Sequence, residues 1–84
     1  MSNSKQLQQM KKVHKTSMDC IKHLVTKKGY TIQQAEDMVM QTLKESAHYL
    51  QAGLAEETIA TLKMTYLDQS VEDAAKDVIK QFLK

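Results

Sequence analysis

The side chains with the greatest chemical potential lie close together near residue 20. Asp19 and His23 are four residues apart and Cys20 and His23 are three apart, so on a helix all three share part of one surface. This cluster is at most half of a metal site, because zinc sites usually take four ligands and His14 and His48 have no complementary paired spacing. We therefore predict a small buried Cys20 and a surface Asp19, with no metal, no cofactor and no catalytic residue.

Adjacent carboxylates are the other candidates for acid–base chemistry. They occur as the pairs Glu36–Asp37, Glu56–Glu57 and Glu72–Asp73. Each pair falls in the first turn of an expected helix, where negative charge complements the helix macrodipole, so helix stabilisation explains all three. Neither Gly29 nor Gly53 has a second glycine nearby, as a phosphate-binding loop requires. We expect that the chain is not an enzyme and has no small-molecule substrate.

The elements that position these residues should all be helices. Proline is absent, glycine occurs only twice, and apolar residues recur at helical spacing over most of the chain. We predict an all-α domain over residues 1–84, a small bundle of four helices. A long basic helix spans residues 5–28 after a disordered segment 1–4, and an acidic helical body spans 31–84. The body comprises a central helix that Gly53 ends, a short helix over 54–68 and a last helix from Val71 to the end of the chain.

Local signals mark the boundaries of these helices. Gly29 can adopt the left-handed conformation that closes the first helix, and Thr31 with Gln34 has the pattern of a capping box at the start of the second. Ser70 is placed to cap the last helix. The division at Gly29 also separates the charges, because seven of the twelve lysines lie before it and nine of the ten acids after it.

The first helix is amphipathic and basic. Its apolar side includes Leu7, Met10, Val13, Ser17, Met18, Cys20, Ile21, Leu24 and Val25. Its opposite side carries a basic stripe of Lys5, Lys11, Lys12, Lys15 and Lys22. Such a stripe is either a solvated face or a surface for an acidic protein or a phosphate backbone. The chain has no arginine, so bidentate readout of guanine is excluded.

Two features of the body predict self-association. The apolar arc of the second helix is wider than one packing partner needs, which makes this helix the expected centre of the bundle. The third helix has apolar residues on two sides, and its Thr58, Thr61 and Thr65 are expected to face solvent. We predict a homodimer whose contacts involve Met38, Met40, Met64 and Leu67, since methionine suits adaptable interfaces.

Composition limits the class of protein. With 84 residues and 26% charged residues, the chain is one small globular domain. It has no apolar run of membrane-spanning length, no signal sequence and one cysteine, so we expect a cytoplasmic protein that binds no membrane. The predicted function is that of a small regulatory or inhibitor protein, of the kind that bacteria and their phages encode, acting by protein–protein binding. The alternative is a nucleic-acid-binding accessory protein that uses the basic face of its first helix.

Overall fold

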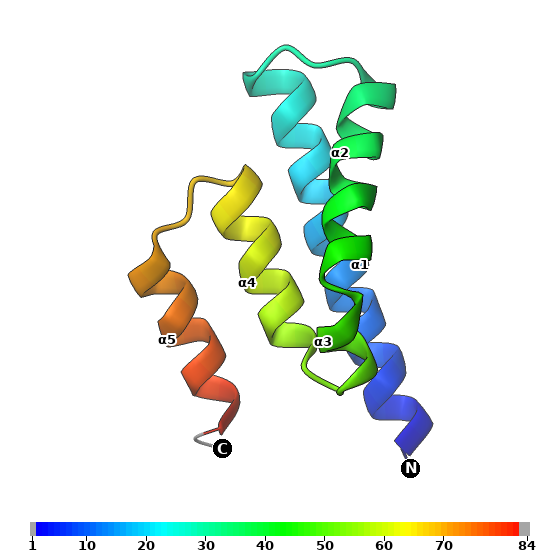
Figure 1. Ribbon diagram of the computed structural model, residues 1–84, viewed down its shortest axis with the longest axis vertical. Helices are drawn as coiled ribbons and strands as arrows, with labels where there is room; N and C mark the ends of the chain where they lie inside the picture. Colours follow the sequence, from blue (N-terminus) through cyan, green and yellow to red (C-terminus); the bar gives the residue numbers. More distant parts are fainter. Residues whose placement is uncertain (1, 83–84) are drawn as a thin grey trace.

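The chain folds into helices joined by short turns. A computed structural model describes the backbone of residues 2–82 and the side chains of residues 5–80. Its helices, labelled in Figure 1, are α1 (Ser2–Lys27), α2 (Ile32–Glu45), α3 (Ala47–Gln51), α4 (Ala55–Tyr66) and α5 (Val71–Phe82). No strand occurs among the described residues, and the predicted all-α class is confirmed. Helix α1 begins at Ser2 rather than at Lys5. Residue 1 lies outside the described residues, and disorder of segment 1–4 stays a prediction.

The turn between α1 and α2 follows the sequence signals closely. Gly29 has a φ of 80°, and the amide of Tyr30 after it donates to the Leu24 carbonyl at 3.1 Å. Both bonds of the predicted capping box are present: Gln34 N donates to Thr31 Oγ1 at 3.1 Å, and Thr31 N donates to Gln34 Oε1 at 3.0 Å. These bonds satisfy amide groups that the helix start would otherwise leave unpaired.

A break at Ser46 makes five helices where four were predicted. The segment that the sequence assigned to one helix ending at Gly53 is divided into α2 and α3. Ser46 Oγ donates to the Thr42 carbonyl at 2.8 Å, and Thr42 Oγ1 lies 3.3 Å from the Met38 carbonyl. Hydroxyls that bond to the carbonyl four residues back compete with the backbone and bend helices, which explains the interruption.

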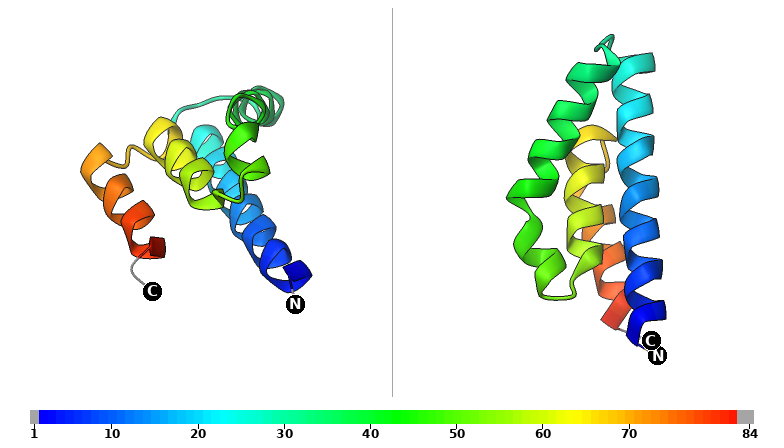
Figure 2. Two further views of the ribbon diagram at one scale, coloured as in Figure 1. Left: turned by 60° about the horizontal axis from the view of Figure 1, so that its bottom comes forward. Right: turned by 90° about the vertical axis from the view of Figure 1, so that its right-hand side faces the viewer.

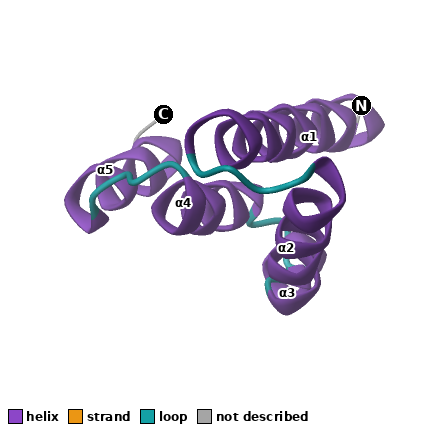
Figure 3. Ribbon diagram, turned by 90° about the horizontal axis from the view of Figure 1, so that it is seen from above, coloured by secondary structure: helices purple, strands orange, loops and turns teal. Residues whose placement is uncertain are grey.

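Helix α4 is the centre of the molecule, so the prediction that the second helix is central was wrong. Among the described residues, every other helix contacts α4, whereas α5 contacts α4 alone. Seen from above, α1 and α2 lie on one side of α4 and α5 on the other (Figure 3). Because α4 is enclosed in this way, its Thr58 is completely buried, although the sequence predicted that Thr58 faces solvent.

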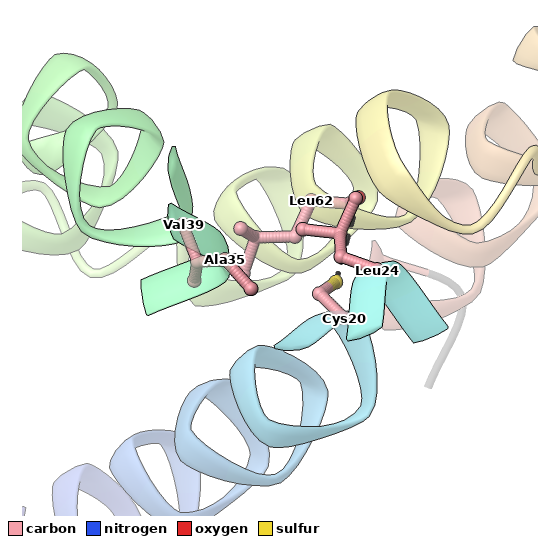
Figure 4. Packing of buried hydrophobic residues seen from close by; sticks show 5 residues of the cluster. All are labelled: Cys20, Leu24, Ala35, Val39 and Leu62. Carbon is pink, nitrogen blue, oxygen red and sulfur yellow. Dashed lines mark hydrogen bonds between the residues drawn. The ribbon is translucent and has the colours of Figure 1, made fainter. Parts of the chain in front are cut away.

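The core lies where α1, α2 and α4 meet. Its larger cluster consists of Cys20, Leu24, Ala35, Val39 and Leu62, which converge in Figure 4, and a second cluster consists of Val13, Ala55 and Ile59. The thiol of Cys20 donates to the Leu62 carbonyl over 3.7 Å, and Tyr66 Oη joins α4 to α2 by a 2.8 Å bond to the Met38 carbonyl. The molecule is a slab of 40 × 28 × 18 Å, and the views in Figure 2 show how thin it is. Large parts of α1, α2 and α5 therefore face solvent.

Candidate protein-binding groove

The cluster around residue 20 is divided between the core and the surface. Cys20 is fully buried, Asp19 is exposed, and His23 is half-buried with its Nε2 3.8 Å from Asp68 Oδ2. Within the described part of the chain, no three His, Cys, Asp or Glu side chains are placed to share a metal ion.

We expect Cys20 to be chemically inert in the folded protein. Burial, and to a lesser extent the Asp19 carboxylate, raise the pKa of this thiol from 9.0 to about 11, while Lys63 acts in the opposite direction. At pH 8 the folded chain should react with iodoacetamide at least about 100-fold more slowly than the chain in denaturant. The reason is that the folded chain holds about one hundredth as much thiolate as the unfolded chain at this pH. Equal alkylation rates in the two states would contradict the buried position.

The same pKa predicts how stability depends on pH. The thiol of the unfolded chain deprotonates near pH 9, before that of the folded chain, so the folded state holds more protons between pH 9 and 11. Stability should therefore fall as the pH rises above 9.

The three carboxylate pairs lie on different helices and do not form one site. Glu56 and Glu57 are in the first turn of α4, and Glu72 and Asp73 in that of α5. The third pair, Glu36–Asp37, begins at the fifth residue of α2, so its predicted place in the first turn was wrong.

The basic stripe is exposed along its whole length, but its members differ in their neighbours. Lys12 lies 3.6 Å from Glu56 of α4, and Lys5 is near the start of α1. Lys11, Lys15 and Lys22 make no ion pair with any described residue and are called the lysine row below. At 100° per residue these three lie on the side of α1 opposite the buried Val13 and Leu24.

An apolar groove lies between the lysine row and α2. Its cavity volume is about 360 Å³, and α1 contributes one wall while α2 and α3 contribute the other. The partly exposed residues of the walls are Met10, Met18, Met40 and Leu50, and the deeper ones include Val13, Val39 and Leu43. Met18 is three residues after Lys15 and four before Lys22, so two lysines of the row border the groove directly. Glu36 belongs to the opposite wall.

This groove was not predicted, because the sequence assigned Met10 and Met18 to the face of α1 that packs in the bundle. They are 68% and 50% exposed, since α4 covers only the part of that face around Val13 and Leu24. One feature of the sequence could have indicated the groove: the apolar arc of α1 is wider than one neighbouring helix can cover.

The residues predicted for a dimer contact lie on several surfaces. Met38 and Leu67 are half-buried against the core, and Met40 lines the groove. Met64 lies in a second apolar hollow of about 340 Å³ between α4 and α5, called the α4–α5 seam. The seam is lined chiefly by Tyr49, Ala60, Met64, Val71, Val78 and Ile79.

Comparisons with protein-family models, with curated proteins and with solved structures give no match. Among the described residues, no helix combines the length and the apolar character needed to cross a membrane.

Proposed function

We propose that this protein is a small regulatory protein that acts by binding another protein, and that the groove between α1 and α2 receives an amphipathic helix of that partner. The observation that carries the proposal is the groove itself, in which exposed methionines lie beside an unpaired lysine row. Exposed apolar grooves of this kind are typical docking sites for amphipathic helices. Methionine side chains adapt to such ligands because they are flexible and polarizable.

The charges around the groove specify the chemistry of the partner. Lys15 and Lys22 border the α1 side beside Met18, whereas Glu36 lies on the α2 side. The bound helix should therefore carry acidic residues along the edge that faces α1, and neutral or basic residues along the edge that faces α2. This asymmetry fixes the rotation of the bound helix about its own axis.

A pair of synthetic peptides tests the proposal. Each has about 18 residues, or five turns, with the same leucine face, and the edge residues are glutamate in one peptide and lysine in the other. Fluorescence anisotropy should show saturable binding of the glutamate peptide, and at least about tenfold weaker binding of the lysine peptide. Equal affinities, or no binding of either peptide up to about 1 mM, would overturn the proposal.

Substitutions in the groove locate the binding site. Met18→Lys and Met40→Lys should each raise the Kd of the glutamate peptide by about 30-fold or more, because each puts a charge into an apolar contact. Gln41→Lys adds the same charge at the next residue, which is exposed and does not line the groove, and should leave the Kd within about twofold. If all three variants bind like the wild type, the peptide binds elsewhere.

The lysine row also supports a second candidate function, contact with a nucleic acid. Three lysines without ion-pair partners on one side of α1 can follow a phosphate backbone. A fluorescent single strand and a duplex, titrated at two salt concentrations, separate the two functions. Tight binding of either probe that weakens steeply with salt and is unaffected by Met18→Lys would favour this second function.

A further inference from the structure

The groove between α1 and α2 has two distinct ends. The two helices run in opposite directions along it, and the turn that joins them lies beyond one end (Figure 1). Two buried clusters show which residues of the two walls share a level. Near the turn, Ala35 of α2 belongs to the same cluster as Cys20 and Leu24 of α1. Farther from the turn, Leu43 packs against the cluster of Val13. These levels are called the turn end and the open end below.

The turn end of the groove is slightly negative. Lys22 of α1 and Glu36 of α2 belong to this end, because both lie within the stretches that form the first cluster. Asp37 follows Glu36, and both carboxylates are within one helical turn of Met40, which lines the groove. One lysine and two carboxylates leave this end a formal charge of −1.

The open end of the groove is strongly positive. Lys44 borders it on α2, four residues after Met40. Lys11 and Lys15 border it on α1, where Lys11 is three residues before His14 of the groove wall. The three lysines are exposed and make no ion pair with any described residue. They give this end a formal charge of +3.

A helix bound between these ends is sensitive to their charges, because its backbone dipole makes its amino end partly positive and its carboxyl end partly negative. In one direction, the amino end lies at the negative turn end and the carboxyl end at the positive open end. In the other direction, each end of the helix meets charge of its own sign. Since both ends contribute, we expect a preference of about tenfold or more for the first direction.

We propose that the partner helix lies in the groove antiparallel to α1 and parallel to α2, with its amino end beside Glu36 and Asp37. Acidic residues in its carboxyl-terminal half contact Lys11, Lys15 and Lys44. This inference rests on the proposed function, to which it adds the direction of the bound helix and the half of that helix in which acidic residues matter.

Nitroxide labels on the glutamate peptide test the direction. Both peptide ends are blocked to remove their charges, and the label is attached to a cysteine at one end or the other. With the label at the amino end, the NMR signals of the Ile21 and Glu36 amides should broaden more than those of Met10 and Leu50. With the label at the carboxyl end, the order should reverse.

The outcomes distinguish this inference from the proposed function. The opposite pattern of broadening, or equal broadening at both ends of the groove, would overturn the direction alone. A peptide that does not bind would overturn the proposed function and this inference with it.

A charge exchange on α2 tests the cause of the direction. Glu36→Lys with Lys44→Glu preserves the net charge of the chain and leaves each end of the groove a formal charge of +1. Both labels should then broaden both ends similarly, and a variant that keeps the wild-type pattern would contradict the electrostatic cause. Glu72→Lys with Lys76→Glu is the matched control on α5, which does not line the groove, and should keep that pattern. Glu45→Gln should keep it too, because Glu45 is five residues, or about 140°, around α2 from Met40.

Glutamine in one half of the peptide tests which acidic residues matter. Replacing the glutamates of the carboxyl-terminal half should raise the Kd at least about fivefold more than replacing those of the amino-terminal half. The effect of these changes on the helicity of the free peptide has the opposite sign, so helix stability cannot produce this result. Equal losses from the two halves, or a larger loss from the amino-terminal half, would overturn the inference.

Discussion

Replacing Leu62 by alanine should lower the free energy of unfolding by about 3–5 kcal/mol, enough to unfold much of a small domain at room temperature. Leu62 is the largest fully buried side chain of the described residues, and it packs against residues of both α1 and α2. Its truncation leaves a cavity in the larger of the two buried clusters in which α1, α2 and α4 meet. Urea denaturation followed by circular dichroism measures this loss. The slope of the free energy of unfolding against urea concentration should be the same in the variant as in the wild type.

Leu7→Ala is the matched control for this substitution. Leu7 is 54% exposed on α1, so the same change in side chain should cost less than about 1 kcal/mol. A Leu62→Ala protein as stable as Leu7→Ala would mean that α4 does not pack against α1 and α2 as described.

Replacing Lys11, Lys15 and Lys22 together by glutamine should leave the fold unchanged and reduce binding. All three are exposed and opposite the buried side of α1, so each should change stability by less than about 0.5 kcal/mol. At low salt the association rate of the glutamate peptide should fall by about 10- to 100-fold, measured by stopped-flow fluorescence. If a nucleic acid is the partner, the slope of log affinity against log salt should become shallower by up to about three.

The control triple variant removes the same charge elsewhere. It replaces Lys12, Lys27 and Lys28, of which Lys12 and Lys28 lie 3.6 Å from Glu56 and Asp68 respectively. Since two of these lysines already have acidic neighbours within the chain, the association rate should change by less than about threefold. Equal effects of the two triple variants would show that net charge, rather than the lysine row, attracts the partner.

The parts of this fold that depend on neighbours in the sequence could be predicted. The capping box of Thr31 and Gln34, the left-handed Gly29 and the capping bond from Asp73 N to Ser70 Oγ are all confirmed. Each of these features involves residues at most three positions apart, so propensity and hydrogen-bonding chemistry determine them locally.

The parts that depend on distant neighbours could not be predicted. The position of Thr58 was wrong because helical periodicity does not reveal that α4 is enclosed on several sides. The break at Ser46 was missed because serine interrupts a helix only when its hydroxyl bonds backwards. Met10 and Met18 of the groove were correctly placed on an apolar side of α1, but periodicity cannot say which part of such a side remains uncovered.

The central position of α4 also affects the order in which the protein can fold during synthesis. Helix α4 spans Ala55–Tyr66, so most of the chain is made before Leu62 exists. Until then, an α1–α2 hairpin has no third helix against which to bury Cys20, Leu24, Ala35 and Val39. At about 5–20 residues per second the hairpin waits for about a second or more on the ribosome with these side chains accessible. During this interval we expect these side chains to be open to chaperones, and the core to form only after α4 has left the exit tunnel.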